Sequence, residues 1–157
     1  MNKILSVKAA ITIAKKLKSK NKSIVLVGGF FDILHAGHIK FLQNAKKQAD
    51  YLFVLLEDDK KARKTKGPKR PINFQKDRAK ILSALESVNY VILLKNMTND
   101  DQYDKIIIQI QPAIIATTLN DPYINHKKRQ AKLVKGKVMR VIKRINHHST
   151  TQLAENL

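Results

Sequence analysis

The hydrophobic and polar positions along this chain predict helices that alternate with short strands. Apolar residues recur at helical spacing from Ile4 to Leu17, with lysines between them, and this pattern predicts an amphipathic N-terminal helix. The same spacing returns further along, where we expect helices over 38–49, 74–85, 101–110 and 125–134. Asn73 is the expected cap of the helix that starts at residue 74, and Ser149 is the expected cap of a last short helix.

Short apolar runs between the helical segments predict the strands. These runs cover 23–27, 51–56, 90–94, 113–117 and 137–142. Because most of them are apolar on both faces, they fit a parallel sheet with a helical layer on each side. We therefore expect a single α/β domain over residues 1–157, a Rossmann-like open parallel sheet with helices on both faces and an extra N-terminal helix. The basic segment 60–70 contains Gly67 and Pro68 and is expected to be a mobile loop.

Composition narrows the class of protein. The chain has 157 residues, of which 43% are hydrophobic and none is cysteine. This fits one globular domain and excludes disulfides, thiolate zinc sites and cysteine nucleophiles. No segment approaches the roughly 18 consecutive apolar residues of a membrane span, and the lysine-dotted N-terminus lacks the apolar core of a signal peptide. We expect a cytoplasmic protein that does not act on a membrane.

A net charge of +19 predicts a surface that attracts anions, such as triphosphates, sugar phosphates or nucleic acid. A solvated basic surface without any such partner explains the charge equally well. A nucleic-acid-binding module is a further interpretation, but only 6% of residues are aromatic and no basic segment rich in aromatic residues offers bases a stacking surface. The composition therefore favours small anionic ligands over nucleic acid.

The segment that follows the first predicted strand carries the most chemistry, and it reads GGFFDILHAGH over residues 28–38. Ligands of open α/β sheets bind at the carboxyl ends of strands, and two glycines there let backbone N–H groups approach a ligand closely. His35 and His38 then lead into a helix whose N-terminus offers free N–H groups and the positive end of the helix dipole. A phosphate at this place would meet backbone donors and two imidazoles, and the local positive field is expected to keep His38 neutral. One histidine alone would more simply be a cap or a surface residue.

Residues 29–38 resemble the G-x-F-D-x-x-H-x-G-H signature of the cytidylyltransferase-like nucleotidyltransferase superfamily. The run Arg70-Pro71-Ile72-Asn73, with Asp77-Arg78 and 81–88 behind it, is similar to the central R-P-x-N stretch of that family. The triplet Ser149-Thr150-Thr151 is similar to its C-terminal S-T-T. Within the superfamily, the N-terminal helix, Lys66-Gly67 and the unbroken segment 31–38 resemble the adenylyltransferase domain of ADP-heptose synthase.

The resemblance implies an enzyme that transfers a nucleoside monophosphate, AMP rather than CMP, from a triphosphate to a phosphorylated small molecule and releases pyrophosphate. The implied acceptor is a sugar or polyol phosphate such as heptose 1-phosphate. Glycerol-3-phosphate cytidylyltransferase and archaeal-type FMN adenylyltransferase are similar too and stay as alternatives, as does a family member that binds nucleotide without turnover. The resemblance also implies a homodimer, for which the apolar N-terminal helix offers a contact.

Nucleotidyl transfer needs positioning and charge neutralisation more than a strong base, because the attacking phosphate oxygen is already an anion. Mg²⁺ is expected to accompany ATP or CTP, bound by phosphate oxygens and water, with no side-chain metal ligand assigned. The expected catalytic residues are His35, His38, Lys66, Arg78 and Arg144. The expected nucleotide-binding residues are Gly28, Gly29, Phe30, Phe31, Asp32, Gly37, Ser149, Thr150 and Thr151. The expected acceptor or base loop contains Thr117, Thr118, Asn120 and Asp121.

Several positions depart from the family pattern. Phe30 stands where a small residue is usual, Lys76 where glutamate is common and Asn89 where aspartate is common. Residues 116–121 read ATTLND in place of the V-K-G-G-D of the heptose enzymes. This last difference concerns the loop that would bind the base or the acceptor, so both the acceptor and the choice of ATP or CTP stay open at this point.

Overall fold

Six parallel strands form the sheet at the centre of the computed structural model, which describes residues 2–142, 150–155 and 157. In spatial order they are β1 (Ile4–Ser6), β4 (Tyr90–Leu93), β3 (Tyr51–Leu56), β2 (Ile24–Gly29), β5 (Ile114–Thr118) and β6 (Lys137–Ile142). The chain runs from β2 to one side of the sheet through β3 and β4, and then returns to β5 on the other side. The switch point between β2 and β5 is where open α/β sheets bind ligands.

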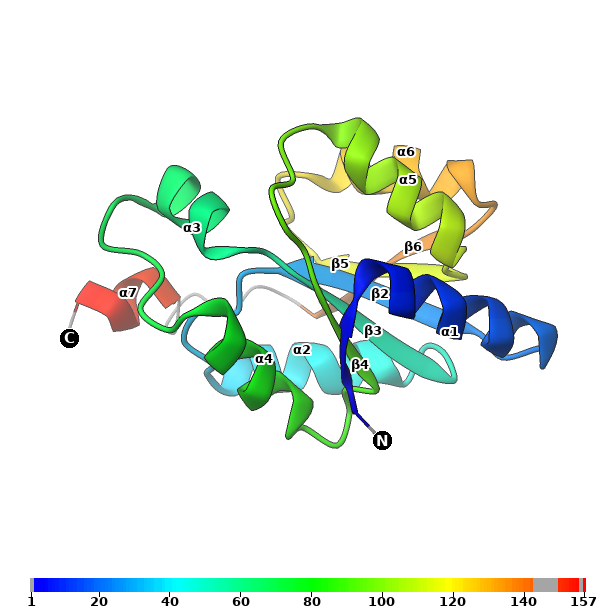
Figure 1. Cartoon of the computed structure of the whole chain (residues 1–157), viewed down its shortest axis with the longest axis horizontal. Helices are drawn as coiled ribbons and strands as arrows, with labels where there is room; N and C mark the ends of the chain where they lie inside the picture. Colours follow the sequence, from blue (N-terminus) through cyan, green and yellow to red (C-terminus); the bar gives the residue numbers. More distant parts are fainter. Residues whose placement is uncertain (1, 143–149, 156) are drawn as a thin grey trace.

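Helices cover both faces of this sheet (Figure 1). One layer contains α1 (Val7–Ser19), α5 (Asp100–Ile110) and α6 (Ile124–Leu133), and the other contains α2 (Ala36–Lys46) and α4 (Gln75–Ser83). The strands contribute side chains to the cores on both faces of the sheet. In β2, Ile24 and Leu26 pack under the first helical layer, and Val25 and Val27 pack under the second. The predicted Rossmann-like sheet with helices on both faces and an N-terminal helix is confirmed. No helix in the described part of the chain is long and apolar enough to cross a membrane.

The N-terminal segment differs from the prediction in two respects. Residues Ile4–Ser6 form the edge strand β1, and the helix starts only at Val7, because a run of three residues is too short to show a period. Ser6 caps α1 by accepting the N–H of Ala9 at 3.2 Å. Ala10, Ala14 and Leu17 on the apolar side of α1 pack into the core, and the homodimer stays a prediction.

The segment that was expected to be a mobile loop is a helix in its first part. Residues Asp59–Lys66 form α3, which lies beyond the carboxyl ends of the strands (Figure 1). Asp58 caps it by accepting the N–H of Lys61 at 2.7 Å, and basic residues in the last turn complement the helix dipole. This basic segment can therefore form a helix because Asp58 caps its first turn.

Two further local predictions are corrected. The first long strand was expected to end at residue 27, but Gly28 and Gly29 are the last residues of β2, paired with Leu55 and Leu56 of β3. Asn73 is not the cap of α4, which begins after Phe74 without a side-chain cap. The predicted cap Ser149 lies outside the described residues, and α7 (Thr150–Glu155) is the last helix.

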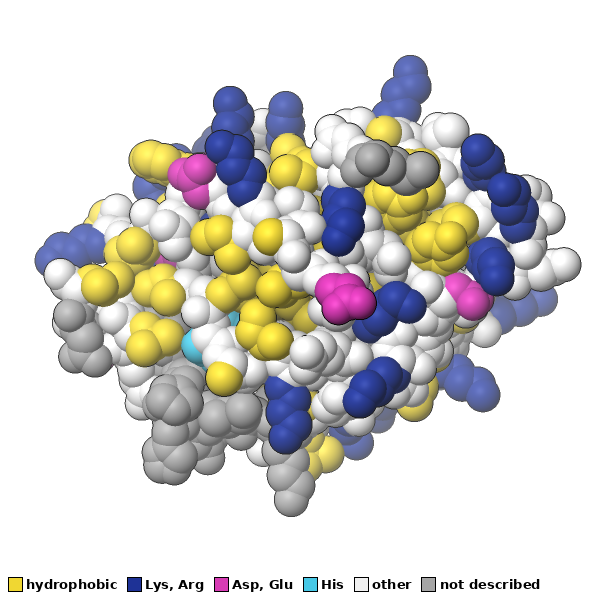
Figure 2. Space-filling view, turned by 90° about the horizontal axis from the view of Figure 1, so that it is seen from below, with side chains coloured by type: hydrophobic (Ala, Val, Ile, Leu, Met, Phe, Trp, Pro, Cys, Tyr) yellow, Lys and Arg dark blue, Asp and Glu magenta, His cyan; other side chains and the backbone are white. Residues whose placement is uncertain are grey.

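The positive charge is spread over the surface as separate side chains. Figure 2 views the molecule from the side of α2 and α4, and hydrophobic side chains lie exposed there between Lys and Arg side chains that stand apart. Around α4 the exposed apolar side chains are those of Ile72, Phe74 and Ile81. The described residues of this face therefore do not form the continuous basic groove that nucleic-acid binding uses.

Candidate active site

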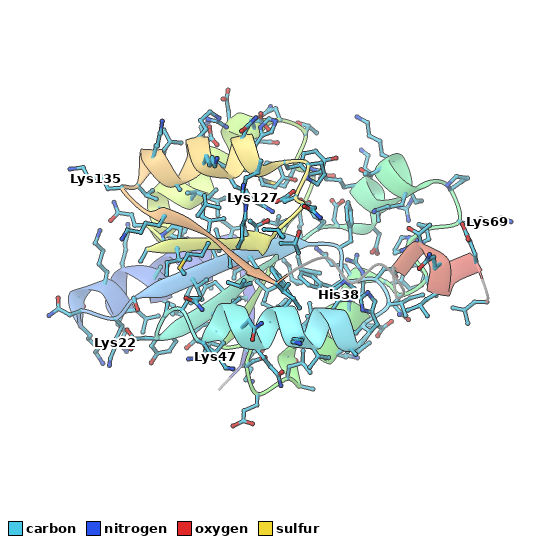
Figure 3. The ribbon with its side chains drawn as sticks, turned by 180° about the vertical axis from the view of Figure 1, so that it is seen from behind. Lys22, His38, Lys47, Lys69, Lys127 and Lys135 are labelled. Atoms are coloured by element: carbon cyan, nitrogen blue, oxygen red, sulfur yellow. The ribbon has the colours of Figure 1, made fainter. Side chains whose placement is uncertain are left out.

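The two histidines lie at the beginning of α2, where the chain leaves β2. His35 is the N-cap of this helix, and its Nδ1 accepts the N–H of Gly37 at 3.1 Å. The rings of His35 and His38 stack with centroids 3.9 Å apart, and Figure 3 shows His38 at the amino-terminal end of α2. Phe31 contacts His38 edge-on at 5.3 Å. The sequence-predicted pair is thus brought together in one stack at a helix N-terminus.

His38 is neutral at physiological pH. Burial is the main cause, the neighbouring His35 adds to it, and together they lower the pKa of His38 to about 4 against a hydrogen bond with the backbone of Ile33. The Nδ1 atom is buried and has no hydrogen-bond partner among the residues that the structure describes. The expectation of a neutral ring agrees with this pKa, although burial and not the helix field is the dominant cause.

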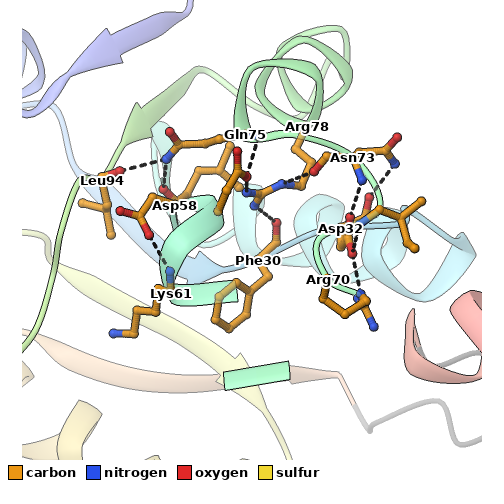
Figure 4. Close-up of polar contacts among 12 residues, drawn as sticks. Phe30, Asp32, Asp58, Lys61, Arg70, Asn73, Gln75, Arg78 and Leu94 are labelled. Carbon is orange, nitrogen blue, oxygen red and sulfur yellow. Dashed lines mark hydrogen bonds and ion pairs between the residues drawn. The ribbon is translucent and has the colours of Figure 1, made fainter. Parts of the chain in front are cut away.

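Asp32 joins the segment after β2 to the segment before α4 (Figure 4). Its carboxylate accepts hydrogen bonds from Arg70 Nε at 2.7 Å, from the N–H of Ile72 at 2.9 Å and from the N–H of Asn73 at 2.8 Å. Burial acts to raise the pKa of Asp32, but the two backbone donors and Arg70 outweigh it and the pKa lies below its usual range. Asp32 was predicted among the nucleotide-binding residues, and with a side chain 2% exposed it is placed to position the loop instead.

Arg78 is completely buried, and its guanidinium has three partners in the protein (Figure 4). It donates to the carbonyl oxygen of Phe30 at 2.5 Å, to that of Asn73 at 2.9 Å and to Asp59 Oδ1 at 2.7 Å. These bonds tie the end of β2, the start of α3 and the start of α4 to one side chain. The predicted direct grip of Arg78 on a triphosphate does not fit this burial, because the donors point at protein oxygens.

A pocket of about 550 Å³ opens beside the end of β2, on the face that α5 and α6 cover. Its floor contains Gly28, Gly29 and Phe30, and its walls come from the end of β3 and from α3, α5 and α6. Lys66 lies at the rim, with Nζ 5.7 Å from the centre of the Phe30 ring. Phe30 and Lys66 were both predicted site residues, and the structure places them against each other in this pocket.

The loop after β5 forms a closed polar cluster next to the pocket. The hydroxyl of the buried Thr117 hydrogen-bonds to the Asp121 carboxylate, which also forms an ion pair with Lys127. Lys127 lines the pocket and lies 3.0 Å from Thr117 Oγ1, and Figure 3 shows it on α6. Of the four predicted loop residues, Thr117 and Asp121 are engaged with each other, whereas Thr118 is half-buried and Asn120 is exposed.

Part of the predicted phosphate site falls on the C-terminal segment. Arg144 and Ser149 lie outside the described residues. Thr150 and Thr151 begin α7, which lies beyond the carboxyl ends of the strands (Figure 1). A contact of these four residues with nucleotide therefore stays a prediction.

The pocket wall contains residues that the sequence interpretation missed. Glu57 directly follows the apolar run of β3 at the same edge as the glycines, so its position after a strand was a usable signal. Lys61, Tyr103 and Lys127 come from α3, α5 and α6. No spacing in the sequence joins them, because only the packing of the helices over the sheet places them together.

An open parallel sheet with stacked histidines at the first helix after the switch-point strand defines a nucleotide-binding enzyme of the nucleotidyltransferase class. Residues 26–156 match the family model described as Cytidylyltransferase-like, and the chain belongs to this family. It is a nucleotidyltransferase of this family, as the motifs predicted.

Curated relatives and solved structures agree with this family. The chain is 48% identical over 96 residues to bifunctional protein HldE of Wolinella succinogenes, which covers 61% of this chain and 20% of that protein. It is 44% identical over 103 residues to bifunctional protein HldE of Nitratiruptor sp., covering 66% of this chain and 21% of that protein. The chain thus spans about a fifth of the length of the relatives it matches.

A lipopolysaccharide core biosynthesis protein from Thermoplasma volcanium has a similar structure, with a TM-score of 0.65 and 30% identity over 79% of this chain and 99% of that one. Pantoate-beta-alanine ligase from Francisella tularensis superposes with a TM-score of 0.67 over 98% of this chain and 72% of that one. The latter is only 15% identical, so it supports the fold alone.

Proposed function

We propose that this chain transfers AMP from ATP to a sugar or polyol phosphate in the cytoplasm, with heptose 1-phosphate as the first candidate acceptor. The observation that carries the proposal is the stacked pair His35 and His38 at the start of α2, the helix that follows the switch-point strand β2. The similarity to HldE supports ATP and a sugar phosphate over the glycerol 3-phosphate and FMN alternatives.

In this reaction an oxygen of the acceptor phosphate attacks the α-phosphorus of ATP. A new P–O bond forms, the bond from the α-phosphorus to the bridging oxygen breaks, and pyrophosphate leaves with that oxygen. Negative charge therefore moves toward the leaving pyrophosphate, and fixed donors aimed at it lower the barrier. We assign this role to the N–H groups at the start of α2, to His35 and to His38, which as a neutral ring donates or accepts without first losing a proton.

The remaining cations of the site neutralise the triphosphate. Lys66 at the rim of the pocket is the described candidate, and Arg144 with Ser149, Thr150 and Thr151 is the predicted one at the C-terminal end. The described residues contain no group of three His, Asp, Glu or Cys side chains that would hold a metal ion alone. Mg²⁺ prefers oxygen ligands, and lysine and histidine side chains do not supply them. Phosphate oxygens and water would therefore hold the Mg²⁺, which would polarise the phosphates.

The test is pyrophosphate release in the presence of Mg²⁺, with ATP and CTP each supplied against heptose 1-phosphate, glycerol 3-phosphate and FMN. Release with ATP and heptose 1-phosphate that is lost in His38→Ala supports the proposal. Release with CTP and glycerol 3-phosphate, or with ATP and FMN, assigns the alternative acceptor. Binding of ATP without release in any pair contradicts the proposal and favours a nucleotide-binding family member without turnover.

A further inference from the structure

Gly28 leaves an open space over the end of β2. Neither packing nor backbone geometry requires a glycine at this position. It pairs with Leu55 in the sheet, and its φ angle is not in the left-handed region where glycine is favoured. A Cβ atom built on Gly28 would meet nothing nearer than Leu55 at 3.9 Å, which is ordinary contact. Any small side chain would therefore fit, and it would project into the pocket. The glycine keeps the pocket floor free for a ligand.

Glu57 stands on the wall of the same pocket with only part of its hydrogen-bonding capacity used. Its Oε1 accepts the hydroxyl of Tyr103 at 2.6 Å and lies 3.7 Å from Lys61 Nζ. Lys61 also contacts the Tyr103 hydroxyl. Glu57 Oε2 is buried and has no hydrogen-bond partner among the described residues. A buried acceptor without a donor is energetically unfavourable, so a donor supplied from the pocket would relieve this cost.

The acidic groups around the pocket differ in how far the protein already satisfies them. Asp121 is held by Lys127 and Thr117, and the exposed Asp100 lies 3.3 Å from His126. Glu57 is the carboxylate in this part of the structure that keeps an oxygen unsatisfied. Burial raises the pKa of Glu57, and the hydrogen bond from Tyr103 and the charge of Lys61 partly offset this.

The chemistry of the pocket thus has two parts. The ammonium groups of Lys61, Lys66 and Lys127 line it and suit a phosphate group. A carboxylate is an acceptor only, and the uncharged ligand groups that donate to it are hydroxyl and N–H groups, of which a sugar or polyol phosphate offers hydroxyls. A phosphate ester that carries several hydroxyls would satisfy both parts together, whereas a phosphate with an apolar body would leave Glu57 unsatisfied.

We propose that Glu57, positioned by Tyr103, determines acceptor specificity by accepting hydrogen bonds from hydroxyl groups of a polyhydroxylated phosphate ester that lies over Gly28. This proposal rests on the proposed function, since it names the residue that reads the acceptor of that reaction. A site that binds a substrate hydroxyl through a buried polar group discriminates strongly against analogues that lack the hydroxyl.

The first experiment measures the KM values of Glu57→Gln for heptose 1-phosphate and for ATP by pyrophosphate release. Glutamine keeps the size of the side chain and one oxygen but removes the charge. We expect the acceptor KM to rise at least tenfold while the ATP KM stays within twofold of the wild-type value. An unchanged acceptor KM in a folded Glu57→Gln protein overturns the proposal. It would show that the carboxylate binds Tyr103 and does not contact the acceptor.

A second measurement does not depend on turnover. Calorimetric binding of heptose 1-phosphate and of inorganic phosphate is compared in the wild-type chain and in Tyr103→Phe, which keeps the ring and removes the hydroxyl that holds Glu57. We expect weaker binding of heptose 1-phosphate by threefold or more and unchanged binding of inorganic phosphate. Equal losses for both ligands contradict a hydroxyl-reading role. This variant keeps the proposal testable if Glu57→Gln does not fold.

A third experiment changes the floor of the pocket. Gly28→Val places a side chain where we locate the acceptor, and it should abolish heptose 1-phosphate binding. If the valine variant binds heptose 1-phosphate normally, the acceptor does not lie over Gly28. If the wild-type chain neither binds heptose 1-phosphate nor releases pyrophosphate with any tested acceptor, the proposed function fails, and the specificity proposal fails with it.

Discussion

Arg78 donates a hydrogen bond from Nη1 to the carbonyl oxygen of Phe30 at 2.5 Å, which joins the helix α4 to the end of the strand that carries the site. The same guanidinium contacts Asp59 at 2.7 Å, so the first turn of α3 is tied to the same point. A side chain that was expected to touch phosphate is buried and joins the end of β2 to the start of α3. The geometry of this part of the site therefore depends on the bonds that Arg78 makes within the protein.

Replacement of Arg78 by alanine should destabilise the fold more than it changes ATP affinity per folded molecule. The change removes the guanidinium partner of Asp59, which keeps only the N–H of Gln75, and it takes a donor from the carbonyl oxygens of Phe30 and Asn73. Breaking a buried charged pair costs about 3–5 kcal/mol. Urea unfolding followed by circular dichroism measures this loss, and Arg78→Lys should recover part of it. A protein that keeps its unfolding midpoint but loses ATP affinity would restore the direct phosphate role.

Replacement of Asp32 by asparagine should loosen the segment 70–73. The amide cannot accept the full set of bonds from Arg70 and the backbone of Ile72 and Asn73, so we expect a loss of about 1–3 kcal/mol in the free energy of unfolding. Asp77→Asn, an exposed carboxylate in the first turn of α4, is the matched control and should change stability by only a few tenths of a kcal/mol. Equal effects of the two substitutions would show that the Asp32 bonds contribute nothing particular.

The low pKa of His38 predicts a defined dependence of stability on pH. The folded pKa of about 4 lies below the ordinary value of 6.5, so the unfolded chain takes up a proton first as the pH falls. The free energy of unfolding should therefore fall between pH 6.5 and pH 4, and His38 should account for about 2 kcal/mol of the difference between pH 7 and pH 5.

Comparison with His38→Asn isolates this contribution, because the other titrating groups remain in both proteins. Proton NMR of the imidazole Cε1–H reports the pKa directly and should show no titration of His38 between pH 6 and pH 8. A midpoint near 6.5 would mean that the ring is solvated and that the stack with His35 does not form.

Lys66 should contribute to ATP binding through its charge. We expect Lys66→Ala to raise the KM for ATP about tenfold, which corresponds to about 1.4 kcal/mol, and to reduce the dependence of that KM on salt. Lys64→Ala in the same helix is the control, since Lys64 does not line the pocket. A similar change in both variants would reflect the general positive field and not a contact of Lys66.

The order of strands and helices followed from local pattern because parallel strands that are buried on both faces are almost continuously apolar. The run 51–56 was predicted with the bounds that β3 has in the structure. Elements without such a signal were missed, namely the three-residue edge strand β1 and the basic helix α3. β1 is held by pairing with β4, and α3 is stabilised by the cap at Asp58. Neither feature appears in the periodicity of hydrophobic residues.

The sequence by itself determined the class of fold, the family and the place of the histidine pair, because all three depend on residues that are neighbours along the chain. Only the tertiary structure decided which side chains line the pocket. It placed Arg78 and Asp32 in buried bonding networks, and it brought Glu57 to Tyr103 across 46 positions of the chain. Burial and contact between distant segments arise when helices pack on the sheet, and no local period encodes them.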